Sequence, residues 1–410
     1  MESKIFLNTF YQILGKFIIS IFGFLTTYLL AHKLGAVGFS EYSLVFSFVG
    51  FAFIFADFGL GTLLTRTIAS KKIEKKYISD IFTLRILISL LILMISVIIV
   101  FFLPYTLKIK TGIIIASFSS IFLLLSSTIW SVFQAELNFR KIVLSQIISS
   151  LSLFVFILAV IYFNLSFYFF ISATVISAFV GLLISFKLSA IKSLISFDAS
   201  KYKTIVRKSL PFGLGLIASV AYFKIDSIIL SFYYNPSFKP DVGFYALSYK
   251  IFEVGLVFGG FFSQSLFPYF SKIINTQNLL ASFKKYFIYS LLLSIATTLF
   301  LFFFAKPLVL ILGGPDFVKS VFPLQILSFA AGVSILSGFF LSVAIAGHKE
   351  IMLLKLSAAA FFINVILNLI FIPQFSLIAA SYITVITQFF ILGANAYAAI
   401  LCLKRQKLIK

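Results

Sequence analysis

Residues 10–31 read FYQILGKFIISIFGFLTTYLLA, an apolar stretch in which Lys16 is the single charged residue. A helix needs roughly 20 consecutive apolar residues to cross the hydrocarbon core of a bilayer, and this stretch is long enough. A cleaved signal peptide is the alternative interpretation. The stretch is longer than a typical signal core, however, and His32 and Lys33 follow it in place of a small-residue cleavage site. We therefore expect residues 10–31 to form a retained membrane span.

The composition of the whole chain indicates that lipid is its main solvent. Of the 410 residues, 61% are hydrophobic and only 11% are charged, whereas about 25% of the residues in a soluble domain are charged. A water-soluble fold cannot bury so much apolar side chain. The single cysteine, Cys402, excludes an intramolecular disulfide, and the two histidines, His32 and His348, are far apart in the sequence. We expect no metal centre and no cofactor.

Apolar stretches of span length recur along the chain and predict an all-α membrane protein with about twelve transmembrane helices. The expected spans are residues 8–31, 41–63, 79–102, 112–135, 141–163, 167–187, 209–233, 242–268, 283–304, 319–346, 352–372 and 377–401. A basic linker at 188–208 separates a six-helix N-terminal lobe, residues 1–187, from a six-helix C-terminal lobe, residues 209–410.

The basic residues predict how the chain is oriented. A net charge of +21 would suggest a nucleic-acid partner in a soluble protein. Here, however, 23 Lys and Arg lie in loops on one side of the predicted membrane and 6 on the other. Cytoplasmic loops are enriched in Lys and Arg. We therefore expect no nucleic-acid partner, and we expect both termini and the linker to be cytoplasmic.

The two halves of the sequence resemble each other. Residues 37–39 and 242–244 both read VGF and open the second and the eighth span, at a spacing of 205. Residues 173–177 (ATVIS) and 383–387 (ITVIT) are similar in the sixth and the twelfth span, at a spacing of 210. Because six spans are an even number, both halves cross the membrane in the same direction. Parallel repeats with a substrate site between them are a known transporter architecture.

Charged and amide side chains within spans usually face the bundle interior or a water-filled cavity. From the side chains of this kind we select four cations, three acids and two amides as candidates: Lys16, Arg85, Lys224 and Lys250; Asp57, Asp226 and Glu253; Asn364 and Asn368. The two asparagines are spaced i, i+4 and so share a helix face. The three acids are candidates for coupling transport to a proton or sodium gradient.

Purely structural roles compete with these interpretations. Asp57 lies near the end of its span and can pair with Arg66 or Arg85. Lys250 precedes Glu253 by three residues, so neutralisation of that acid is an alternative role for Lys250. The sequence leaves both alternatives open.

Four short stretches occur in order along nearly the whole chain. They are LGAVGF at 34–39, ADFGL at 56–60 followed by Arg66, SLPFG at 209–213 followed by Asp226, and Asn364 and Asn368 followed by IP at 372–373. Together they resemble the Wzx-type oligosaccharide flippases of the multidrug/oligosaccharidyl-lipid/polysaccharide exporter superfamily. The sequence departs from that pattern at Ser376, where the family usually has glycine.

The resemblance implies a MATE-like bundle in which two lobes form a V around a central cavity. It implies that the substrate is an undecaprenyl-pyrophosphate-linked oligosaccharide, which is moved from the cytoplasmic to the outer leaflet of a bacterial inner membrane. The product would be a surface polysaccharide such as the O-antigen of lipopolysaccharide. A polysaccharide polymerase and a chain-length regulator are the further partners that the resemblance implies.

The resemblance also suggests which side chains bind the diphosphate. Related lipid II flippases place cations on helices 1, 2 and 8, where the candidates in this sequence are Lys16, Arg66 and Lys250. Charge-assisted hydrogen bonds from cations suit a diphosphate that leaves water. The remaining candidate substrate-binding residues are Arg85, Lys224, Asn364 and Asn368.

Transport is favoured over catalysis. No GxxxxGK phosphate-binding motif occurs, and the predicted outer loops, at most about fifteen residues, are too short for a catalytic domain. We therefore expect a protein that is not an enzyme; a membrane glycan polymerase or ligase is the weaker alternative. The main alternative is a cation-coupled multidrug exporter of the same superfamily. Such an exporter needs an anionic cavity, whereas the basic residues within the spans match or outnumber the acidic ones.

Overall fold

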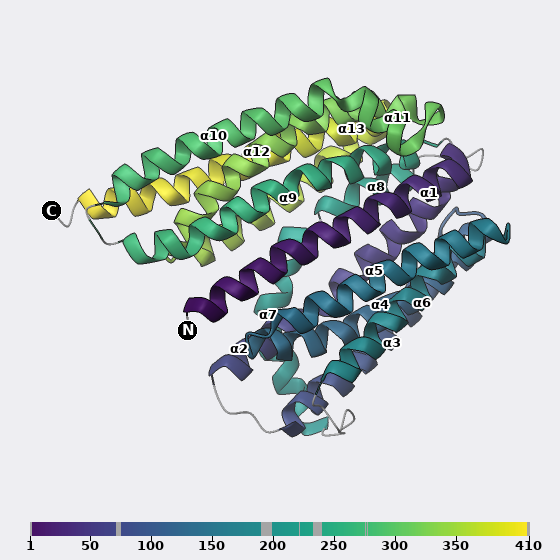
Figure 1. Cartoon of the computed structure of the whole chain (residues 1–410), viewed down its shortest axis with the longest axis horizontal. Helices are drawn as coiled ribbons and strands as arrows, with labels where there is room; N and C mark the ends of the chain where they lie inside the picture. The colour runs from purple at the N-terminus through teal and green to yellow at the C-terminus, as the bar shows by residue number, and fades with distance from the viewer. Residues whose placement is uncertain are drawn as a thin grey trace. The chain divides into compact units, whose positions relative to one another are not determined.

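The fold is that of an all-α protein, as the apolar periodicity predicts (Figure 1). A computed structural model describes residues 2–70, 75–189, 199–220, 222–232, 240–274, 276 and 278–407. Within these ranges the regular elements are thirteen α-helices and one short 3₁₀-helix, and no strand occurs. Residues 190–198 of the predicted linker lie outside the described residues.

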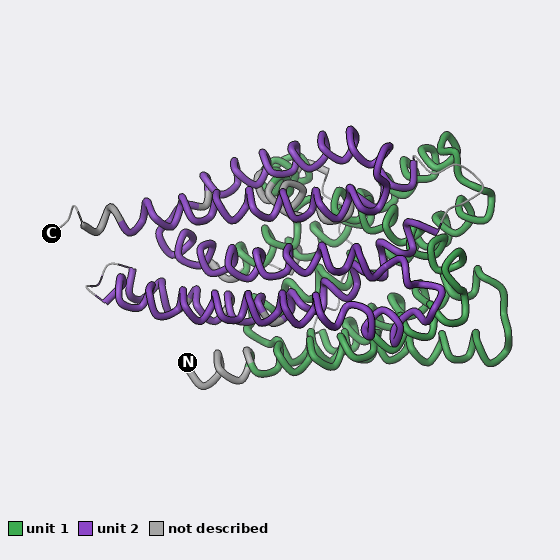
Figure 2. Tube along the Cα trace, turned by 90° about the horizontal axis from the view of Figure 1, so that it is seen from above, with its two compact units in different colours: residues 1–224, 235–238 green, residues 225–234, 239–410 purple. Residues whose placement is uncertain are grey.

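The helices form two compact units (Figure 2). Unit 1 contains the described residues up to Lys224, and unit 2 contains the described residues from Ile225 onward. The helices that begin in unit 1 are α1 (Glu2–Asp57), α2 (Leu60–Ser70), α3 (Lys75–Phe102), α4 (Leu107–Ala135), α5 (Phe139–Tyr162), α6 (Phe167–Leu188), α7 (Ala199–Val220) and α8 (Tyr222–Phe232). Those of unit 2 are α9 (Asp241–Ile273), α10 (Leu279–Phe303), α11 (Ala305–Gly313), η1 (Pro315–Ser320), α12 (Val321–Ala346) and α13 (Glu350–Lys407). The predicted C-terminal lobe begins at residue 209, within α7, whereas α7 packs in unit 1. The division into two six-helix lobes at the linker therefore stays a prediction.

Nine helical segments of the described chain are long and apolar enough to cross a membrane. Two of them, in α1 and α13, are about twice as long as one span requires. Each contains one residue with non-helical dihedral angles, Gly35 (φ 64°) and Ser376 (φ 53°), at which the helix changes direction. With α7 and α8 over the predicted seventh span, the described helices account for the twelve predicted spans.

The second span differs from its prediction. Residues 41–63 were expected to be continuous, but α1 ends at Asp57 and α2 begins at Leu60. Phe58 and Gly59 both have positive φ, 44° and 72°, and two consecutive residues in this region cannot continue an α-helix. The break therefore turns the chain directly after Asp57.

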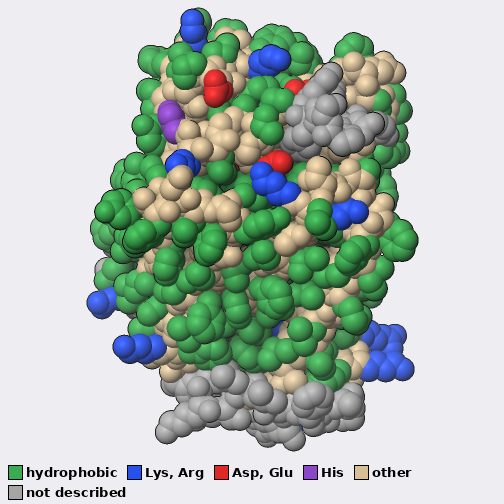
Figure 3. Space-filling view, turned by 90° about the vertical axis from the view of Figure 1, so that its right-hand side faces the viewer, with side chains coloured by type: hydrophobic (Ala, Val, Ile, Leu, Met, Phe, Trp, Pro, Cys, Tyr) green, Lys and Arg blue, Asp and Glu red, His purple; other side chains and the backbone are tan. Residues whose placement is uncertain are grey.

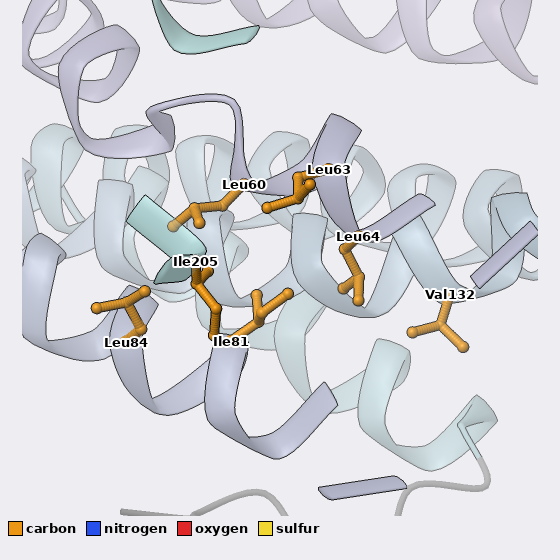
Figure 4. Close-up of a cluster of buried hydrophobic side chains, with 7 residues drawn as sticks. All are labelled: Leu60, Leu63, Leu64, Ile81, Leu84, Val132 and Ile205. Carbon is orange, nitrogen blue, oxygen red and sulfur yellow. The ribbon is translucent and has the colours of Figure 1, made fainter. Parts of the chain in front are cut away.

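Apolar side chains form the interior of each unit. In unit 1, one cluster joins four helices: Leu60, Leu63, Leu64, Ile81, Leu84, Val132 and Ile205 (Figure 4). In unit 2, a phenylalanine-rich cluster joins α9, α10, α12 and α13; Phe270 and Phe339 meet edge to face there, with ring centroids 5.8 Å apart. These clusters fix the helices that carry the polar groups described below.

Large apolar side chains also cover the outside. Phe102 and Tyr162 are 85% and 83% exposed. Hydrophobic side chains are also widespread on the face shown in Figure 3, with a few Lys and Arg side chains among them. Such a surface is stable only against lipid. The chain is a multi-pass membrane protein.

Candidate functional site

Unit 2 contains a buried carboxylate held by neutral donors. Asp226 in α8 is 1% exposed. Its Oδ2 accepts hydrogen bonds from the Tyr245 hydroxyl and from Thr384 Oγ1, each 3.0 Å long. Its Oδ1 accepts a 2.7 Å bond from Asn368 Nδ2. Three helices, α8, α9 and α13, therefore converge on one carboxylate.

The network continues along α13. Asn368 Nδ2 also donates to Asn364 Oδ1 at 2.9 Å, and Asn364 Nδ2 donates to Thr387 Oγ1 at 3.1 Å. Asn364, Asn368 and Thr387 are fully buried. The Asn368 Oδ1 atom is buried and accepts no hydrogen bond. The cluster thus combines a carboxylate with a second oxygen that lacks a donor.

The kink in α13 allows both of its halves to reach Asp226. Pro373 lacks an amide hydrogen, and Ser376, three residues later, adopts φ 53°. The chain turns there, which brings Thr384 to the carboxylate that Asn368 already contacts. Ser376 Oγ donates a 2.5 Å hydrogen bond to Asp241 Oδ2 at the start of α9. The turn is therefore tied to the helix that supplies Tyr245.

No Lys or Arg among the described residues forms an ion pair with Asp226. Burying an ionised carboxylate without a cationic partner is costly, so neutralisation by a proton or a small cation stabilises such a site. The described residues hold no group of three or more His, Cys, Asp or Glu suited to a metal ion. Asp226 is thus a buried carboxylate whose observed donors are all neutral.

Unit 1 buries a charge of the opposite sign. Arg85 in α3 is fully buried and forms an ion pair with Asp57, which is 19% exposed. Its Nη1 also donates to the Leu124 carbonyl at 3.1 Å and to Ser127 Oγ and Thr128 Oγ1 at 2.8 Å. Of the two partners that the sequence offers Asp57, the structure selects Arg85.

Two of the sequence motifs meet beside this ion pair. A Cβ atom placed on Gly213 in α7 would lie 2.9 Å from the carbonyl carbon and oxygen of Phe58. Contacts this close do not occur for real side chains, so only glycine fits. The SLPFG stretch at 209–213 therefore packs directly on the backbone that follows Asp57.

The remaining predicted residues lie apart from these clusters. Lys250 in α9 forms an ion pair with Glu253, with 3.5 Å between Nζ and Oε2, and the two side chains are 45% and 37% exposed. Lys16 in α1 and Arg66 in α2 are exposed. The Lys224 side chain lies outside the described part of the structure.

Sequence reasoning missed Tyr245, Thr384 and Thr387 as partners of Asp226 and the asparagines. A signal for two of them was present, because Thr384 and Thr387 belong to the repeated segment 383–387. Tyr245 follows the repeated VGF directly, but a tyrosine in an apolar helix carries no comparable signal.

A small cavity of about 20 Å³ lies among α1, α3 and α4 of unit 1. Its lining includes four serines, Ser89, Ser96, Ser117 and Ser120. This volume holds about one water molecule, whereas sites for small-molecule ligands occupy at least about 300 Å³. A saccharide does not fit there.

Solved structures with the same fold are transporters. The fold matches a lipid II flippase MurJ in an inward closed conformation, with a TM-score of 0.76 and 16% identity over 97% of this chain and 91% of that one. An inward-facing multidrug resistance MATE family transporter of the MOP superfamily gives 0.69 and 13% over 95% of both chains. The Vibrio cholerae MATE transporter VcmN gives 0.64 and 16% over 98% and 97%. At these identities the likeness establishes the fold alone.

The sequence comparisons are more specific. No curated protein matches the chain. The family model described as "polysaccharide biosynthesis protein" matches residues 5–274, which is well over half of the sequence. The chain therefore belongs to the polysaccharide biosynthesis protein family and has the MATE-like transporter fold.

Proposed function

We propose that this protein is a flippase that moves an undecaprenyl-pyrophosphate-linked oligosaccharide from the cytoplasmic to the outer leaflet of a bacterial inner membrane. The observation that carries the proposal is the joint match to a polysaccharide biosynthesis family and to the fold of a lipid II flippase. A glycan carried on a lipid diphosphate is a substrate class that fits both. Both termini are cytoplasmic in this proposal, and a polymerase and a chain-length regulator act with the protein on the delivered glycan.

Lys16, Arg66 and Lys250 are the proposed ligands of the diphosphate, with Lys224 as a further candidate. A diphosphate that leaves water needs cationic partners with good hydrogen-bond geometry. The side chains of Lys16, Arg66 and Lys250 are exposed on their own units. An exposed cation is accessible to a ligand, which supports this assignment.

Lys250 and Arg85 differ in how readily they can change partner. The Lys250–Glu253 pair is partly exposed, and such pairs contribute only about 0–1 kcal/mol. Lys250 can therefore exchange its carboxylate for a diphosphate at little cost. Arg85 is fully buried between Asp57 and three further acceptors, which favours a structural role over substrate binding.

Asp226 is the proposed coupling residue. Asp57 is paired with Arg85 and Glu253 with Lys250, whereas Asp226 has only neutral donors among the described residues. A proton or a sodium ion that enters the cluster would neutralise the carboxylate, with the buried Asn364 and Asn368 beside it. Alternating occupancy by one cation can then drive the transport cycle.

The decisive experiment uses Lys250 in a flippase-null strain, with surface glycan measured and protein abundance checked by immunoblot. Loss of one charge-assisted hydrogen bond costs roughly 1.5–3 kcal/mol, so Lys250→Ala should reduce substrate binding about ten- to hundredfold. Lys250→Arg should retain much of the export, and Lys250→Glu should abolish it. Normal export by Lys250→Glu at normal abundance would disprove the role of this residue.

Glu253 supplies the matched control. If Lys250 serves only to neutralise Glu253, the double variant Lys250→Ala/Glu253→Ala should restore export. If Lys250 binds the diphosphate, the double variant should remain as defective as Lys250→Ala. Efflux of cationic dyes by the wild-type protein, without glycan export, would instead favour the multidrug exporter.

A further inference from the structure

The first turns of α7 separate charge from apolar surface. Lys201, Lys203, Arg207 and Lys208 are exposed, while Ile205 is 2% exposed. At 100° per residue these four cations lie on one side of the helix, and Tyr202, Ile205, Val206 and Ser209 lie on the other. We call the first side, with Thr204, the basic face of α7.

The apolar side of this segment is already occupied. Ile205 belongs to the buried cluster of α2, α3 and α4 in Figure 4, and Tyr202 and Val206 pack against it. The helix is therefore held on the body of unit 1 by apolar contacts. A partner for this segment has only the basic face left to bind.

An ion pair fixes the edge of the basic face. Asp80 in α3 is fully buried, and neither of its carboxylate oxygens accepts a hydrogen bond. Lys201 Nζ lies 3.9 Å from Asp80 Oδ2. Because a buried carboxylate without hydrogen bonds favours a nearby cation, this ion pair holds Lys201 close to the body of unit 1.

Three cations on this face remain without a counter-charge in the described structure. Lys203, Arg207 and Lys208 form no ion pair with another described residue. The sequence of α7, ASKYKTIVRKSLPFGLGLIASV, contains no acid. Like charges held close together on one helix repel each other, so the face favours an anionic partner.

We propose that the basic face of α7 binds the anionic phospholipid headgroups of the membrane surface at which α7 begins. The position along the chain favours lipid over an acidic protein. The basic turns lead directly into the predicted seventh span, which starts at residue 209. At about 1.5 Å per residue, residue 201 lies no more than about 12 Å along the helix from that point. The proposal holds whatever substrate the protein carries.

The test places a fluorescent dye on the face itself. Thr204 is exposed among the cations, and Cys402 is the single native cysteine. The full chain with Thr204→Cys and Cys402→Ser is labelled and placed in phosphatidylcholine nanodiscs. Each sample contains a small fraction of spin-labelled phosphatidylglycerol or, as the reference, phosphatidylcholine with the same spin label. The ratio of quenching by the two lipids measures local enrichment of the anionic headgroup.

We expect the anionic lipid to quench several-fold more strongly, and salt to reduce the difference because it screens exposed charges. The variant Lys203→Gln/Arg207→Gln/Lys208→Gln should lose this preference, so that the two lipids quench about equally. The matched control, Lys272→Gln/Lys284→Gln/Lys285→Gln, removes three exposed cations elsewhere and should retain it.

Equal quenching by both lipids in the parent protein would overturn the proposal, and this is the result expected if an acidic protein is the true partner. Quenching by neither lipid would place the face away from the bilayer and would also overturn it. An unchanged preference in the α7 variant would show that other residues recruit the lipid, with the same consequence.

Discussion

The two units handle buried charge in opposite ways. In unit 1, Arg85 and Asp57 neutralise each other, and further acceptors surround the guanidinium group. In unit 2, Asp226 is surrounded by neutral donors only. A neutralised pair is stable as it stands, whereas an uncompensated carboxylate gains from binding a cation. The pair in unit 1 therefore favours one charge state, whereas the carboxylate of unit 2 is our proposed site of charge change.

A contact between a threonine and a tyrosine hydroxyl, present in both units, makes the contrast sharper. Thr174 and Thr384 occupy corresponding positions in the repeated segments 173–177 and 383–387. Thr174 bonds to the Tyr42 hydroxyl at 3.1 Å, and the hydroxyl oxygens of Thr384 and Tyr245 lie 3.2 Å apart. In unit 2 the threonine and the tyrosine also donate to Asp226. The same two residue types thus form a hydrogen bond with each other in unit 1 and bind a carboxylate in unit 2.

The largest expected effect concerns the ion pair of unit 1. Asp57→Ala leaves Arg85 buried without its counter-charge, and we expect the free energy of unfolding in detergent to fall by roughly 3–5 kcal/mol. The control is Asp57→Ala/Arg85→Met, which removes both charges and should recover most of the loss. If the double variant is no more stable than the single one, the two residues do not act as a neutralising pair.

The threonines should differ in what they contribute. Thr384→Val removes a donor to a carboxylate, which we expect to cost roughly 1.5–3 kcal/mol if Asp226 is ionised. Thr174→Val removes a bond between neutral groups and should cost only about 0.5–1.5 kcal/mol. Unfolding titrations of both variants in the same detergent test this difference. Equal losses would indicate that Asp226 carries no charge in the folded protein.

Asp226→Asn should separate stability from transport. The Asn368 Oδ1 atom, which now accepts no hydrogen bond, can accept one from the new amide, so we expect unfolding to change by less than about 1 kcal/mol. Transport should nevertheless fall at least about tenfold, because the amide cannot exchange a proton or hold a cation by charge. Export at the wild-type rate would remove Asp226 from the coupling proposal.

The smallest effect is expected at the kink of α13. Ser376 adopts a positive φ that glycine adopts without strain, but its hydroxyl bonds to Asp241. In Ser376→Gly, relief of strain offsets the lost hydrogen bond, and we expect a net change below about 1 kcal/mol. Ser376→Ala keeps the strain and loses the bond, so it should be the less stable of the two. The reverse order would mean that the hydrogen bond contributes nothing.

The sequence predicted the membrane helices well because span length and apolar composition are local properties. It predicted Asn364 and Asn368 on one buried face for the same reason, since their spacing places them there. Partner choice is not local. Whether Asp57 pairs with Arg66 or Arg85 depends on the turn at Phe58 and Gly59. The apolar composition of the surrounding segment does not indicate that turn.

The contacts of Asp226 were hidden for a related reason. Tyr245 and Thr384 are 19 and 158 residues away along the chain, and they meet the carboxylate only because α13 reverses at Ser376. The Wzx-type sequence pattern usually has glycine at this position, so a turn here could be predicted. The register of the helix that follows the turn could not. The substrate-binding roles of Lys16, Arg66 and Lys250 stay predictions. These residues belong to two different units, and local sequence patterns do not indicate which of them contact one ligand.

The close packing of Gly213 on Phe58 has a mechanical consequence. The backbone of α7 contacts the backbone of Phe58 directly there. No side chain lies between them whose rotamer could change to accommodate a displacement. A shift of α7 toward this turn must therefore move Phe58 and, with it, the adjacent Asp57 carboxylate. Movement of α7, the helix that follows the basic linker, is in this way mechanically coupled to the buried Asp57–Arg85 ion pair of unit 1.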